Sequence, residues 1–156
     1  MVVRDQNRTL ALVALALWLA EAVMLAVSTL GVCALLSLSV DFARAGAPAS
    51  SYYQTVGSTF LGLYQHASDV DMLFFCLGAI LWYYLLFRSR IVPRAISAWG
   101  LLAVFPVLLG TLLLVWDRSF GPSAALYVPY VPFEFVIGLW LLVKGASPAS
   151  MAGVFD

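Results

Sequence analysis

Long apolar runs alternate with short polar connections along this chain, and the pattern predicts four membrane-spanning helices. About 20 apolar residues cross the roughly 30 Å hydrocarbon core of a bilayer. Runs of at least that length occur at residues 10–40, 55–87, 96–116 and 124–143. The connections are rich in Pro, Gly, Ser and charged residues, which favour turns and loops. The expected fold class is therefore an all-α integral membrane protein, a four-transmembrane-helix bundle that forms a single membrane domain over residues 1–156.

The composition agrees with a location in lipid. Hydrophobic residues make up 63% of the chain and charged residues only 10%, whereas soluble domains carry roughly 25% charged residues. The lipid bilayer is thus the first expected partner. The formal net charge is zero and the basic residues are scattered or placed at span ends, so nucleic acid is not an expected partner.

The basic residues also predict the orientation. In a four-span arrangement, six of the eight basic residues fall on one side of the membrane, namely Arg4, Arg8, Arg88, Arg90, Arg94 and Lys144. Only Arg44 and Arg118 fall on the other side. Because Lys and Arg accumulate in cytoplasmic loops, both termini are expected in the cytoplasm. The expected location is the inner (plasma) membrane, crossed several times.

Two glutamates interrupt the apolar runs. Glu21 lies in LWLAEAVML and Glu134 in VPFEFVIGLW. At about 1.5 Å per residue, they lie roughly 17 Å and 14 Å from the cytoplasmic boundary, near the middle of the membrane. An ionisable group at that depth costs a few kcal/mol, so it usually has a partner or a function. Glu21 and Glu134 are therefore candidate ligand-binding or buried polar residues.

The two glutamates are expected to face the bundle interior and to lie close together. At a separation of about 5 Å, repulsion and burial would both favour protonated carboxyl groups. The alternative is that each acid is neutral and bonded separately to a neighbouring helix. Pro129 and Pro132 are expected to kink the last span beside Glu134, because proline frees a carbonyl one turn earlier.

A second polar group opens the second span, in the sequence YQHASDVD. His66 and Asp69 are three residues apart and share a helix face, so the carboxylate can orient the imidazole. Both are further candidates for polar contacts. No metal site is expected, because His66 is the only histidine and protein zinc sites need three or four ligands. Cys33 and Cys76 are expected to pack as apolar thiols.

The segment YLLFRSRIVPR, followed by EFVIGLWLLVKG, resembles the bacterial membrane proteins grouped as "domain of unknown function 4386". Typical members have an acidic residue in the first of these spans, a His opening the next, an RSR-x-VPR end and a final Glu before LWLLVKG. The matching residues here are Glu21, His66, Arg88, Arg90, Pro93, Arg94, Glu134, Trp140 and Lys144. The resemblance implies no activity, since the family has none assigned. It covers residues 8–145.

Two departures from the family pattern affect the interpretation. Members are usually longer, with further spans upstream, so the chain resembles the C-terminal part and would leave a lateral face for another subunit. The stretch after His66, normally apolar, carries Asp69 and Asp71 here.

Three functions from different classes are consistent with these residues. The first is a non-enzymatic accessory subunit of a larger membrane complex or a homo-oligomer. The second is binding or transport of a hydrophobic small molecule, such as a lipid or quinone, in a pocket near Glu21 and Glu134. The third is an intramembrane acid/base enzyme. The sequence identifies no nucleophile motif, catalytic residue, metal site or cofactor.

Overall fold

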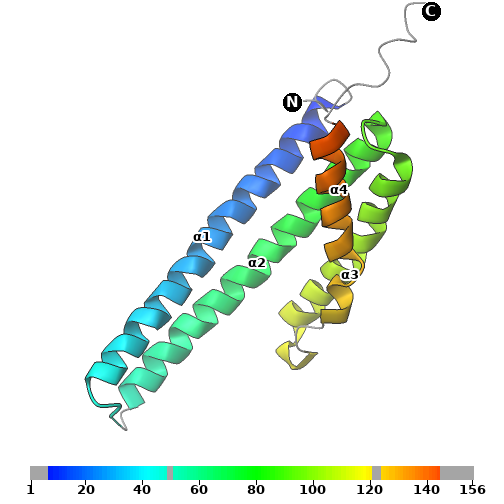
Figure 1. Ribbon diagram of the computed structural model, residues 1–156. Coiled ribbons are helices and arrows are strands. Elements are labelled where there is room, and N and C mark those ends of the chain that lie inside the picture. Colours follow the sequence, from blue (N-terminus) through cyan, green and yellow to red (C-terminus); the bar gives the residue numbers. More distant parts are fainter. Residues whose placement is uncertain (1–6, 49–50, 121–123, 145–156) are drawn as a thin grey trace, which may run out of the picture. The chain divides into compact units, whose positions relative to one another are not determined.

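The computed structural model describes residues 7–48, 51–120 and 124–144. Its helices are α1 (Arg8–Arg44), α2 (Ser51–Ser89), α3 (Arg94–Trp116), the short 3-10 helices η1 (Arg118–Phe120) and η2 (Ala124–Tyr127), and α4 (Tyr130–Lys144) (Figure 1). Four segments are long and apolar enough to cross a membrane, with η2 and α4 forming the last of them. The predicted fold class is confirmed, and the protein is an all-helical multi-pass membrane protein.

The chain divides into two compact units. Unit 1 contains Met1–Trp18 and Leu73–Asp156, and unit 2 contains Leu19–Met72. Both α1 and α2 pass from one unit into the other as continuous helices. The prediction of a single membrane domain stays a prediction.

The first two helices are much longer than one membrane crossing requires. α1 has 37 residues and α2 has 39, which at about 1.5 Å per residue corresponds to roughly 55 Å each. The hydrocarbon core is about 30 Å thick. Each of these helices must therefore tilt strongly or extend beyond the hydrocarbon core.

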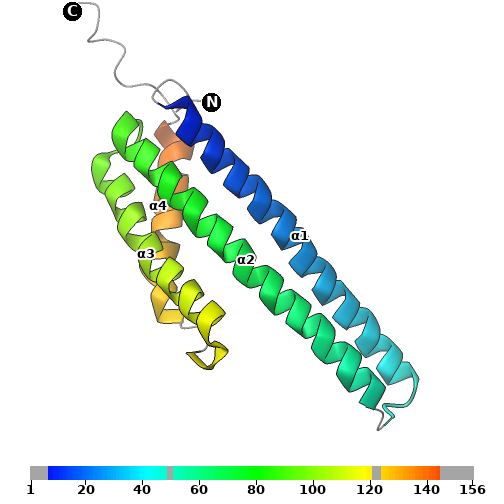
Figure 2. The same cartoon turned by 180° about the vertical axis from the view of Figure 1, so that it is seen from behind.

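Unit 2 is a helical hairpin in which the α1 and α2 segments run antiparallel, seen from both sides in Figures 1 and 2. A Cβ added at Gly31 would lie 3.3 Å from the backbone N of Tyr64, so the two helices approach closely there. Nearer the loop, the rings of Phe42 and Tyr53 make an edge contact with centroids 5.3 Å apart. Phe42 follows Gly31 on α1 by as many residues as Tyr53 precedes Tyr64 on α2. The two antiparallel helices therefore keep the same register between these two contacts.

The end of α1 is closed by a glycine in the left-handed region. Gly46 has φ +78°, its N–H donates to the carbonyl of Ala43 (3.1 Å), and the N–H of Ala47 donates to the carbonyl of Phe42 (3.0 Å). This pair of bonds is the Schellman arrangement that ends many helices. It satisfies terminal carbonyls of α1 and starts the turn toward α2.

In unit 1, α3 and α4 lie side by side and antiparallel (Figure 1). The ring of Phe133 is fully buried and occupies the space left by Gly100 on α3. The C-terminal half of α2 contributes Leu85 to the core, and Ala11 from the start of α1 packs against it. These segments bring α2 and α4 close enough for polar contacts between them.

The start of α4 differs from the expected kinked span. Pro129 lies before the helix and Pro132 in its first turn, where the missing N–H has no helical partner to lose. The prolines therefore mark the beginning of α4 and do not kink it, and the prediction of a kink was wrong. The indole N–H of Trp99 donates to the carbonyl of Pro129 (3.1 Å), which fixes the start of the helix against α3.

Candidate functional site

Glu134 forms a hydrogen-bonded group of three side chains with Tyr130 and Tyr83, termed the triad below. Tyr130 lies one turn before Glu134 on α4 and donates its hydroxyl to Oε1 of the glutamate. Tyr83 on α2 reaches the same oxygen at 3.1 Å. The two phenol oxygens are themselves 2.8 Å apart. A carboxyl group of α4 is thus bonded to a neighbouring helix at one oxygen.

Aromatic packing holds both phenols in place. Tyr83 and Tyr130 are buried, with 4% and 6% of their surfaces exposed. The ring of Phe133 meets Tyr83 edge-on with centroids 4.8 Å apart and also contacts Tyr130. Phe75 makes an edge contact with Tyr130, with ring centroids 5.6 Å apart. Such edge contacts add about 0.5–1.5 kcal/mol each beyond the burial of area, so the phenols form a rigid support for the acid.

Although Tyr83 and Tyr130 are buried, Glu134 itself is exposed. Only its Oε1 atom is engaged by the phenols. Phenols are neutral at ordinary pH and donate one hydrogen each, so the triad orients the carboxyl group without a cation. A second polar group on a partner or ligand can then bond to the outward side of this acid.

Glu21, the other predicted glutamate, lies in unit 2, whereas Glu134 lies in unit 1. Their predicted proximity stays a prediction. Within unit 2, Glu21 belongs to a row of buried or half-buried positions spaced alternately three and four residues apart: Glu21, Met24, Ser28, Gly31, Leu35, Leu38 and Phe42. This spacing is that of a helix-to-helix seam, so Glu21 lies on the side of α1 that packs on α2.

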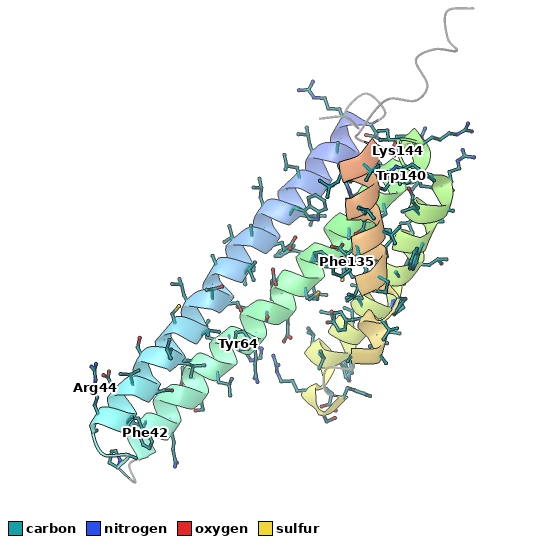
Figure 3. The ribbon with its side chains drawn as sticks, viewed as in Figure 1. Phe42, Arg44, Tyr64, Phe135, Trp140 and Lys144 are labelled. Atoms are coloured by element: carbon teal, nitrogen blue, oxygen red, sulfur yellow. The ribbon has the colours of Figure 1, made fainter. Side chains whose placement is uncertain are left out.

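A matching row on α2 contains Asp71, together with Tyr53, Gly57, Phe60, Tyr64 and Ala67, all of them buried or half-buried except Tyr64, which is 37% exposed. Tyr64 is labelled in Figure 3. The shared register brings Asp71 to the same stretch of the seam as Glu21. The Oδ1 atom of Asp71 is buried and has no hydrogen-bond partner in the described part of the chain. The sequence alone offers no reason to associate Asp71 with Glu21.

His66 and Asp69 lie on α2 in unit 2, and the triad belongs to unit 1. His66 is exposed and Asp69 is half-buried. Their predicted role stays a prediction. Among the described residues, no group of three His, Cys, Asp or Glu side chains could hold a metal ion. Cys76 is fully buried, as expected of an apolar thiol, whereas Cys33 is exposed.

Sequence reasoning identified Glu134 but missed both of its tyrosine partners. Tyr83, which the sequence places among other aromatic residues near the end of the second span, is a buried member of the triad. Tyr130 could have been found, because residues four apart lie on one helix face. Tyr83 could not, since its contact depends on how α2 packs on α4.

A search of the curated proteins and a search of the solved structures each found no match. A search with models of protein families did find one. The model described as "Domain of unknown function (DUF4386)" matches residues 1–145, so the resemblance predicted from the RSRIVPR and LWLLVKG segments is confirmed and the protein belongs to this family.

Proposed function

We propose that the protein is a non-enzymatic membrane subunit that self-associates through one face of α4, with Glu134 as its central polar contact. The observation that carries this proposal is the position of Glu134. It lies in the middle of the last apolar spanning segment, Ala124–Lys144, bonded to two phenols on one side and exposed on the other. A polar carboxyl group exposed to lipid is unfavourable, and a second helix would cover it.

Gly138 supports the same face. It lies one turn after Glu134, and a Cβ added there would meet nothing within 4 Å in this chain. The fold therefore gives no packing reason for a glycine at this position. Small residues let the backbones of two membrane helices approach, and polar side chains then bond across the contact. Both features occur on adjacent turns of α4.

Large apolar side chains flank these two residues. Phe135 is 75% exposed and Leu142 is 86% exposed, and Val131 precedes them on the same side of the helix at a spacing of four. Phe135 and the end of α4, with Trp140 and Lys144, are labelled in Figure 3. An apolar face with a polar centre and one small residue suits contact with another helix. A second copy would present the same face, giving the symmetric pairing that most homo-oligomers use.

A second candidate function is binding of a hydrophobic small molecule. A surface hollow of about 510 Å³, lined by Ala124, Tyr127, Val128, Val131 and Pro132, borders the α4 face at Val131. Its size suits a ligand site, and its apolar lining suits a lipid or quinone. It is open, however, and Glu134 does not line it. Helix association is therefore the better supported proposal.

The experiment compares two glycine variants of the purified protein in lipid nanodiscs or liposomes. Gly138→Leu fills the α4 face, and Gly62→Leu is the matched control, because a Cβ at Gly62 also meets nothing within 4 Å. Self-association is measured by energy transfer between labelled copies at increasing protein-to-lipid ratio. We expect Gly138→Leu to lower it at least tenfold and Gly62→Leu to leave it unchanged. Wild-type protein that stays monomeric, or equal association in both variants, would contradict the proposal.

A further inference from the structure

The connection between α2 and α3 carries three arginines and no acidic residue. Arg88 lies in the last turn of α2, Arg90 in the connection and Arg94 at the first position of α3. No Asp or Glu occurs anywhere from residue 72 to residue 116, so the neighbouring sequence supplies no charge that would neutralise them. All three arginines are exposed. Residues 88–94, termed the arginine turn below, therefore form a concentrated positive patch.

The backbone of the arginine turn is held at several points. The hydroxyl of Ser89 donates to the carbonyl of Leu86 (3.1 Å) and accepts the N–H of Ile91 (3.5 Å). Val92 is fully buried. Arg90 has φ +54°, a left-handed conformation that is uncommon for a residue with a Cβ atom, and the chain reverses there from α2 into α3 (Figure 1). The three arginines are thus attached to a short, anchored reversal of the chain.

A contact with an aromatic ring positions one of the three guanidinium groups. The Cζ atom of Arg94 lies 5.5 Å from the centre of the Phe87 ring, within the range of a cation–π interaction. This contact brings a positive charge from α3 onto the last turn of α2, which also carries Arg88. Positive charges from both helices therefore belong to the same end of this helix pair.

The arginine turn has a defined place relative to the lipid. Both α2 and α3 are long and apolar enough to cross a membrane, so the short connection between them lies at a membrane surface. Lipid phosphates occupy the same level. A guanidinium group can form two parallel hydrogen bonds with one phosphate, and basic clusters beside a spanning helix attract anionic lipids.

We propose that the arginine turn is a binding site for the phosphate group of an anionic phospholipid, held by Arg88, Arg90 and Arg94. The membrane location favours a lipid over a soluble phosphate as the source of this group, because the lipid is already present at the surface where the turn lies. The site belongs to the connection between α2 and α3, and it does not depend on the self-association through α4 proposed above.

The first test compares ligands that share a phosphate group. The full chain in mixed micelles is titrated with dioctanoyl-phosphatidylglycerol, dioctanoyl-phosphatidylcholine and inorganic phosphate, and bound ligand is counted by native mass spectrometry. We expect phosphatidylglycerol to bind at least about tenfold more tightly than phosphatidylcholine, whose headgroup has no net charge. Equal binding of the two lipids would overturn the proposal. Inorganic phosphate that binds as tightly as phosphatidylglycerol would also overturn it, because the ligand would then be a soluble anion.

The second test asks whether the arginine turn holds the lipid. Replacing Arg88, Arg90 and Arg94 together by Gln should lower the affinity for phosphatidylglycerol at least about tenfold. Replacing all three by Lys keeps the charge but removes the forked geometry, and should lower the affinity about threefold or more. Arg44→Gln is the control, because Arg44 is an exposed arginine in the last turn of α1, and it should leave the affinity unchanged.

Two results of this second test would contradict the proposal. A triple Gln variant that binds like the wild type would show that the lipid lies elsewhere. A triple Lys variant that binds like the wild type would show that positive charge alone attracts the lipid, without a site built from guanidinium groups. Because the Lys variant keeps every charge, it tests the site even if the Gln variant does not fold.

Discussion

Gly100 on α3 lies directly beneath the ring of Phe133 on α4. The ring is fully buried, and a Cβ added at Gly100 would overlap three of its carbon atoms. Phe133 in turn contacts both tyrosines of the triad. The absence of a side chain at Gly100 thus allows α4 to approach α3 and places Tyr130 within reach of α2.

Gly100→Ala should therefore destabilise the protein, because Phe133 must move to accept the methyl group. Overpacking of this kind typically costs about 1–3 kcal/mol. The free energy of unfolding in mixed detergent micelles measures the effect. Gly62→Ala adds the same methyl group inside a helix where nothing lies within 4 Å, so it should raise stability by up to about 1 kcal/mol through the higher helix propensity of alanine. Equal effects of the two substitutions would mean that close packing at Gly100 is not what the α3–α4 contact requires.

The triad predicts that Tyr83→Phe lowers the stability of unit 1 by roughly 1 kcal/mol. The substitution keeps the ring that packs on Phe133 but removes both contacts of the hydroxyl. The net contribution of one hydrogen bond to stability is about 0.5–1.5 kcal/mol. In membrane proteins the average contribution of a hydrogen bond between helices is near the lower end of that range. Unfolding in mixed micelles is the measurement, with Tyr84→Phe as the control. A result within error of wild type would place the contribution of the triad to folding near zero.

Glu134 offers a comparison between a polar and an apolar replacement. Glu134→Gln keeps an acceptor and a donor in the shape of a neutral acid, so melting in detergent should change little. Glu134→Leu removes the acceptor of both phenols and should lower stability by about 1–2 kcal/mol. If Gln is as damaging as Leu, the ionised form holds the site together, and a charged partner becomes the better explanation.

The sequence predicted the spans well because length and apolar composition alone decide them. The expected third span, residues 96–116, differs from α3 (Arg94–Trp116) by one turn or less at either end. The site was predicted only in part, since Glu134 is recognisable as an acid in an apolar run whereas Tyr83 becomes its partner through packing between helices. The prediction of a kink was wrong for a local reason. Pro132 lies in the first turn of α4, where it displaces no helical hydrogen bond.

The six-to-two distribution of basic residues predicts the orientation of the chain, and labelling of single cysteines measures it. Cys33 and Cys76 are first replaced by Ala, and cysteine is then introduced at Ala47, in the turn after α1, or at Ser89, at the end of α2. An impermeant thiol reagent should label position 47 from outside intact cells and position 89 only after the membrane is opened. If both positions are labelled from the same side, α2 does not cross the membrane between them, and the four-span arrangement is wrong. The reverse pattern would overturn only the charge argument.

The seam of unit 2 predicts an unusual gain in stability. The Oδ1 atom of Asp71 is buried with no hydrogen-bond partner among the described residues, and such an atom costs about 1–3 kcal/mol. Asp71→Leu removes the polar atom and keeps an apolar seam, so the free energy of unfolding should rise by about 1 kcal/mol. Asp71→Asn is the matched comparison, because it keeps a buried polar group and should give little or no gain. If Leu instead lowers stability, Asp71 makes a favourable contact across the seam, and Glu21, on the same stretch, becomes the first residue to test by a double-mutant cycle.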